Sequence, residues 1–134
     1  MHERIPMRHT LFLFGEAEKG DLCMPLHFCS LPELADRLGN PPEESEGILY
    51  AVQALLYERE LIFFRIREEG FSYTDYLKGL HFLQNKDAFP VLAGICMPGV
   101  GNQELIEAAQ PLCDLHQSCL IISEKDLYDY LTVK

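Results

Sequence analysis

The sequence predicts an α/β protein, built as a three-layer Rossmann-like or flavodoxin-like sandwich with about five strands in a mostly parallel sheet. Continuous apolar runs of strand length, such as HTLFLFG and LIFFRIR, are typical of strands covered on both faces. In the second half, such runs alternate with amphipathic helical patterns, which implies right-handed crossovers and parallel pairing. At 134 residues the chain is expected to form one domain, with residues 1–8 as a flexible or loosely packed N-terminal arm.

The N-terminal part should contribute a central strand and an edge strand. The first apolar run, residues 9–15, is followed by the polar turn EAEKGD, which is too short for a parallel crossover. The next extended stretch, residues 22–29, should therefore run antiparallel to the first strand or leave the sheet. Pro25 favours an edge position, because proline cannot donate a hydrogen bond within the ladder.

Two helix start signals follow. Ser30 with Glu33 forms a capping box, and Gly39 provides a stop, which predicts a helix over residues 31–38. Asn40 precedes two prolines and Glu43 in NPPE, which repeats the signal before an apolar stretch ending at Tyr57. A long, largely buried second helix is expected there.

The second half alternates regularly. Expected strands cover residues 61–67, 89–97 and 119–123. Expected helices run from Ser72, with Asp75 as a capping partner, to residue 83; from Asn102 to about residue 117; and over residues 124–131.

Composition and charge exclude several classes of protein. The net charge of -10 opposes binding to nucleic acid. The longest apolar runs are shorter than the ~20 residues of a membrane span, and the start lacks the apolar core of a signal peptide. We therefore expect a cytoplasmic protein without a membrane partner, whose five cysteines remain reduced thiols.

The carboxyl ends of the predicted parallel strands are the default place for a ligand crevice. The polar residues that follow these ends are mostly acidic. As weak catalytic candidates we take Glu16, Glu18, Lys19 and Cys96, and as candidate ligand-binding residues Glu68, Glu69, Gly99, Gly101, Asn102 and Glu124. Clustered carboxylates could bind a cation or act as a general acid and base, but helix capping and simple solvation explain the same residues.

Two loops carry incomplete motifs. GICMPGVGNQE has the strand-to-helix context of an anion-binding loop, yet Val100 stands where a Walker motif needs lysine, and Glu104 replaces the third glycine of a dinucleotide fingerprint. Pro98 likewise breaks a nucleophile elbow around Cys96. Glycine used for turning and a buried cysteine are the simpler interpretations, and no cofactor is predicted.

Cysteine and histidine recur in CMPLHFC and CDLHQSC. A zinc site is the alternative reading of Cys23, His27, Cys29, Cys113 and His116. Both cysteine pairs have five intervening residues, whereas zinc knuckles favour two to four. Buried thiols and a packed histidine are therefore preferred, and no metal is predicted.

The leading functional hypothesis is a non-catalytic accessory or regulatory protein that binds another protein, or a second copy of itself, through an acidic surface. It rests on the charge and on the absence of any complete catalytic motif. The alternative is a small enzyme or ligand sensor that binds a small molecule in the carboxylate-rich crevice.

Overall fold

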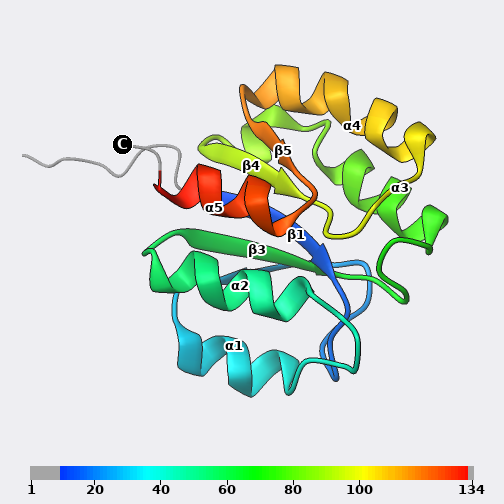
Figure 1. Ribbon diagram of the computed structural model, residues 1–134. Helices are drawn as coiled ribbons and strands as arrows, with labels where there is room; N and C mark the ends of the chain where they lie inside the picture. The colour runs from blue at the N-terminus through cyan, green and yellow to red at the C-terminus, as the bar shows by residue number, and fades with distance from the viewer. Residues whose placement is uncertain (1–9, 133–134) are drawn as a thin grey trace, which may run out of the picture.

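Five strands form one mixed sheet in the order β2-β3-β1-β4-β5 (Figure 1). The computed structural model describes residues 10–132, so the predicted arm at residues 1–8 lies outside the described part. The strands are β1 (Thr10–Gly15), β2 (Pro25–Phe28), β3 (Glu60–Arg65), β4 (Leu92–Cys96) and β5 (Cys119–Ile121). β3, β1, β4 and β5 are parallel, while β2 pairs antiparallel with β3. The predicted α/β class is confirmed, with a mixed sheet in which the antiparallel pair lies at one edge.

Helices cover both faces of this sheet (Figure 1). They are α1 (Leu31–Leu38), α2 (Gly47–Leu56), α3 (Tyr73–Phe82), α4 (Gln103–His116) and α5 (Glu124–Thr132), with the short 3₁₀ helix η1 (Lys86–Ala88) before β4. One buried cluster joins the sheet to α1, α2 and α5, and a second joins its other face to α3 and α4. Within residues 10–132, no helix is long and apolar enough to cross a membrane.

The alternation of side chains along β1 explains why both clusters exist. Leu11 and Leu13 enter the cluster under α1, α2 and α5, whereas Phe12 and Phe14 enter the cluster under α3 and α4. All four side chains are at most 1% exposed. A strand that is buried on both faces needs a continuous run of apolar residues, and β1 has such a run.

The edge strand β2 is shorter than expected. It lies at the edge and runs antiparallel to the first strand in direction, but its pairing partner is β3 rather than β1, and it begins at Pro25 rather than at residue 22. Cys23 has φ 56°, a left-handed conformation that cannot continue a strand. Cys23 therefore does not share a strand face with His27 and Cys29.

Helix α2 begins at Gly47, so the predicted start after Asn40 is wrong. The backbone turns first, because the Ser45 N–H and hydroxyl both donate to the Pro42 carbonyl. Glu44 then adopts φ 63°, which interrupts any helix begun at the prolines. Residues 41–46 form a loop whose three glutamates, Glu43, Glu44 and Glu46, are exposed.

The other helix starts follow their signals to different degrees. Asn102 caps α4 through Oδ1, which accepts from the N–H groups of Glu104 and Leu105. Ser123 and Asp126 cap α5 reciprocally. Ser72 precedes α3, but its hydroxyl bonds Glu68 instead, and Asp75 turns to another partner described below.

Candidate functional site

Two glutamates join the loop after β1 to the loop after β3. The Glu16 N–H donates to Glu69 Oε2, and the Glu69 N–H donates to Glu16 Oε2, both at 2.8 Å. Each carboxylate thus satisfies the backbone of the other residue, 53 positions away in the chain. This reciprocal pair fixes the relative position of two strand ends at the carboxyl edge of the sheet.

Glu69 also supplies the cap that α2 lacks. Its two oxygens accept from the N–H groups of Glu46 at 2.7 Å and Gly47 at 2.9 Å, in the first turn of the helix. The side chain of Glu46, at the N-cap position, makes no capping bond of its own. A carboxylate at this end also suits the helix dipole.

Glycine permits this close approach. A Cβ atom added to Gly47 would lie 2.7 Å from the Gly15 Cα and 2.8 Å from Glu69 Oε2. Both distances are too short for real contacts, so neither the end of β1 nor the start of α2 can carry a side chain here. The Gly15–Gly47 contact lets three separate segments converge on one carboxylate.

Opposing effects act on the Glu69 carboxyl. Burial raises its pKa, and the nearby charge of Glu16 raises it further, while the hydrogen bonds from the Glu16, Glu46 and Gly47 backbone oppose this rise. The Glu69 carboxylate therefore accepts hydrogen bonds from three backbone N–H groups. Its role is to hold the loops in place.

Around this pair lies a crevice of about 480 Å³. It is lined by Glu16, Glu43, Glu44, Arg67, Glu68, Glu69 and Phe71. The Arg67 guanidinium is paired with Asp75, because Nη1 lies 2.6 Å from Oδ1 and the Arg67 N–H donates to Oδ2 at 2.9 Å. Asp75 is 1% exposed, so it balances the arginine from inside the protein. The five lining glutamates then give the crevice a strong negative charge.

Phe71 gives the crevice an aromatic wall. Its side chain is 76% exposed, the largest exposure among the large apolar residues of the described chain. An exposed aromatic ring beside carboxylates suits a cationic group, which can contact the ring face and pair with the carboxylates together.

The structure brings together Glu16, Glu68 and Glu69 from the predicted set. Glu18 is used elsewhere, since its Oε1 accepts from the Asn40 N–H at 2.8 Å, and the Lys19 side chain is exposed. Glu124 lies in a separate hollow of about 380 Å³ between α2 and α5. The predicted residues therefore divide among several places.

Cys96 is not accessible for chemistry. It is 0% exposed, and burial raises the pKa of its thiol well above the ordinary value. The simpler interpretation of this residue, a buried core cysteine, describes its surroundings in the cluster under α1, α2 and α5.

The glycine-rich loop after β4 forms a turn and leads into α4. Gly99 has φ 73°, and its N–H donates to the Ile122 carbonyl at 3.0 Å, while Asn102 occupies amides of the first turn of α4. Space around Gly99 and Gly101 is open. The Gly70 position lies against the Gly99 carbonyl, so this loop borders the loop after β3.

The cysteine and histidine candidates also separate. His116 is buried and donates from Nε2 to the Leu83 carbonyl at 2.7 Å, which ties α4 to the end of α3. Burial raises the pKa of Cys113 to about 11. Among the described residues, His27 and Cys29 lie close to each other and to Glu60, and Cys23, Cys113 and His116 are not part of that group.

Sequence reasoning missed Glu43, Glu44, Arg67 and Phe71 as crevice residues. Glu43 belongs to the predicted start of a helix that in fact begins later, at Gly47. Phe71 carried a usable signal, because a large aromatic residue within the polar stretch EEGFS has no periodic apolar neighbours to pack with.

Comparisons with protein-family models, with curated proteins and with solved structures found no match.

Proposed function

We propose that this protein is a non-catalytic accessory or regulatory domain whose acidic crevice binds a basic segment of a partner protein. The observation that carries this proposal is the crevice of about 480 Å³, lined by five glutamates, a neutralised arginine and an exposed phenylalanine. Lysine and arginine side chains complement the carboxylates and the aromatic ring.

The position of the crevice adds support. We interpret the four parallel strands as a Rossmann-like or flavodoxin-like arrangement, in which ligands bind beyond the carboxyl ends of the strands. β3 and β4 flank β1 on opposite sides, so the chain changes direction across β1. Glu16, after β1, borders that point, and the glutamates after β3 lie one strand further along the same edge.

A binding role fits these carboxylates better than catalysis. Glu16 and Glu69 are occupied by backbone donors, and the Cys96 thiol is buried. The outer residues, Glu43, Glu44 and Glu68, are exposed, and within residues 10–132 their carboxylates accept no hydrogen bond. The inner pair would hold the loops while the outer carboxylates make the contacts.

The test is the binding of fluorescent lysine- and arginine-rich peptides, followed by anisotropy. The variant E43Q/E44Q/E68Q should weaken binding about tenfold, since three exposed ion pairs at ~0.5 kcal/mol each sum to ~1.5 kcal/mol. Phe71→Ala should weaken it about 2- to 5-fold, the value of an exposed cation–π contact.

A matched variant controls for net charge. E104Q/E107Q/D114N removes the same number of exposed carboxylates from α4 and should leave peptide affinity nearly unchanged. Equal weakening by both triple variants would mean that the peptides respond to overall charge alone, and the crevice would then lose its assigned role.

A small enzyme or ligand sensor remains the second candidate. The specific observation in its favour is the raised pKa of Glu69 within a crevice whose volume falls in the usual range for small ligands. A thermal-shift screen of small organic cations and divalent metals tests it. A compound or metal that raises the melting temperature of the wild type but not of Glu68→Gln would favour this candidate over the peptide-binding role.

A further inference from the structure

A second group of polar side chains lies far from the acidic crevice, where β2 runs beside the start of β3. His27 belongs to β2, Cys29 follows that strand, and Glu60 begins β3. In the antiparallel register Phe28 pairs with Leu61, so the next step places Cys29 across from Glu60. His27 lies two residues before Cys29 and shares its face of the sheet.

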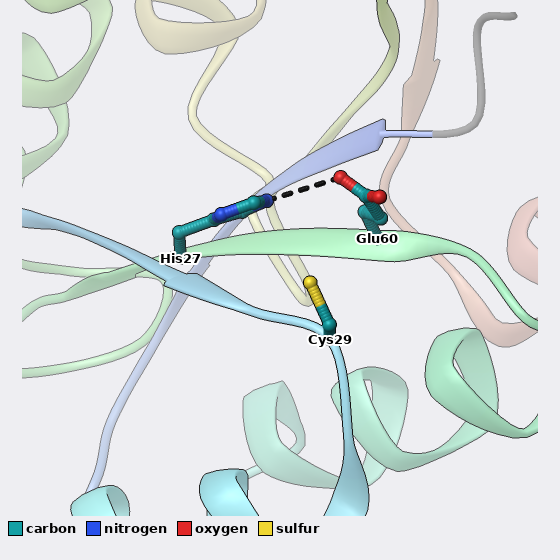
Figure 2. A group of neighbouring side chains, drawn as sticks. All are labelled: His27, Cys29 and Glu60. Carbon is teal, nitrogen blue, oxygen red and sulfur yellow. Dashed lines mark hydrogen bonds and ion pairs between the residues drawn. The ribbon is translucent and has the colours of Figure 1, made fainter. Parts of the chain in front are cut away.

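The three side chains converge (Figure 2). His27 Nε2 lies 3.1 Å from Glu60 Oε1, and the ligand atoms of all three residues lie within 4.8 Å of one another. Around a tetrahedral zinc ion, with bonds of about 2.0–2.3 Å, ligand atoms stand roughly 3.3–3.6 Å apart. All three residues are exposed, so small side-chain rotations can close the difference.

We propose that His27, Cys29 and Glu60 form a zinc-binding site. An imidazole, a thiolate and a carboxylate are the three ligand types that zinc uses in proteins, whereas magnesium and calcium prefer oxygen alone. A thiolate and a carboxylate together also balance the charge of a divalent ion. Three protein ligands leave the fourth position for water.

The backbone around the site is held in place. The Cys29 N–H donates to Glu33 Oε1 at 3.2 Å, and the Glu33 N–H donates to Ser30 Oγ at 3.4 Å, so the capping box of α1 anchors the cysteine. Ladder pairing with β3 fixes His27. The ligands therefore come from a preformed frame.

The site also borders a hollow. His27 and Glu60 line a cavity of about 390 Å³ together with Ile62, Phe89 and Val91. Apolar walls beside a metal limit solvent around it and strengthen its electrostatic interactions. An ion held by the three ligands would lie at the rim of this cavity.

The test uses full-length, reduced protein without a histidine tag. Titration with Co²⁺ should give one equivalent bound, with a thiolate-to-cobalt charge-transfer band, and Zn²⁺ should displace it. Cys29→Ser should abolish the band, while His27→Ala and Glu60→Gln should each weaken Zn²⁺ binding at least ~10-fold in a chelator competition. Circular dichroism checks that each exposed-site variant remains folded.

Matched variants make the assignment specific. Cys119→Ser and His81→Ala remove an exposed cysteine and an exposed histidine outside the group and should leave binding unchanged, as should H2A/H9A. The proposal is overturned if Cys29→Ser retains the charge-transfer band, if any of these controls loses binding, or if wild-type protein takes up no metal at micromolar concentration.

Discussion

The side chain of Glu69 connects the loop after β1 to the start of α2. Its carboxylate accepts from the backbone N–H groups of Glu16, Glu46 and Gly47, and its own N–H is satisfied by Glu16. Three elements of the fold thus depend on one side chain. Few polar residues in the described chain connect such distant segments.

Glu69→Ala should therefore be costly. The substitution leaves part-buried donors without partners, and we expect the free energy of unfolding to fall by about 1–3 kcal/mol in urea titrations at neutral pH. Glu68→Ala changes the exposed neighbour, whose carboxylate has no such bonds, and should stay within ~0.5 kcal/mol of wild type. Similar losses in both variants would contradict the assigned role of Glu69.

Part of this site could be predicted from the sequence. The rule that ligands gather beyond parallel strand ends pointed to Glu16, Glu68 and Glu69, and the crevice contains all three. It could not predict that Glu69 would cap a helix beginning 22 positions earlier, because such a bond depends on the packing of distant segments. Glu43 and Glu44 were missed for the same reason.

Helix α2 shows how a start signal can be overruled. The NPPE pattern satisfied local rules for a helix start, yet the turn at Pro42 and Ser45 and the left-handed Glu44 delay the helix to Gly47. Gly47 is where the chain can approach β1 closely enough to use the Glu69 carboxylate. Tertiary contact, rather than local preference, decides where α2 begins.

Gly47→Ala tests this conclusion. The added methyl group would meet the Gly15 backbone and the Glu69 carboxylate, so we expect unfolding to become easier by about 1–3 kcal/mol. Gly101→Ala is the control, because the space around Gly101 is open, and it should change stability by less than ~0.5 kcal/mol. Thermal and urea unfolding both measure the difference, and a harmless Gly47→Ala would refute the close-packing argument.

The start of α5 carries a pH-dependent cap. Hydrogen bonds from the Ile122 and Ser123 backbone hold the pKa of Asp126 below its ordinary value of 3.8. A lowered pKa in the folded state means that the ionised group stabilises the protein above pH 3.8. That contribution is lost as the pH falls through the folded pKa.

Asp126→Asn should consequently destabilise the protein at pH 7 by about 0.3–1 kcal/mol, the usual value of a charge at a helix N-terminus. The difference from wild type should shrink as the pH drops below 3.8 and vanish once the pH is below the lowered pKa of folded Asp126, because the wild-type side chain is then neutral too. Urea unfolding between neutral and acidic pH measures it, with Asp36→Asn as a control for loss of an exposed carboxylate. A difference that stays constant with pH would rule out the charge as its cause.

The strands were predicted more closely than the helix starts. Continuous apolar runs located β1 and β3, and Pro25 indicated the edge position of β2, although β2 pairs with β3 rather than with the first strand. These features follow from the apolar character of the strands and from the length of the segments that connect them, and both are visible in the sequence. Ser72 and Asp75 looked like a cap, but the nearby Arg67 attracted Asp75 instead, and such competition is visible only once the fold brings the partners together.

Charge acts on the whole molecule. The net charge of -10 is concentrated in part at the crevice, where five glutamates meet and the arginine is already paired. Mutual repulsion among these carboxylates opposes folding, and dissolved salt should relieve it.

Raising NaCl from about 0.01 to about 0.15 M shortens the screening length from about 30 to about 8 Å. We expect the melting temperature to rise over this range in differential scanning fluorimetry, with a smaller rise for E43Q/E44Q/E68Q than for E104Q/E107Q/D114N. A melting temperature that falls with salt, or the same response in both variants, would argue against repulsion centred on the crevice.

The place of β1 in the sheet has a consequence for synthesis on the ribosome. β1 is made before both of its neighbours, since β3 ends at residue 65 and β4 at residue 96. Until residue 96 is made, β1 lacks its partner strand on one side, and its two buried phenylalanines lack the β4 and α4 part of their cluster. Nascent chains that end before β4 should therefore expose the apolar strand β1 to chaperones. Chaperones should release β1 when residue 96 emerges from the exit tunnel.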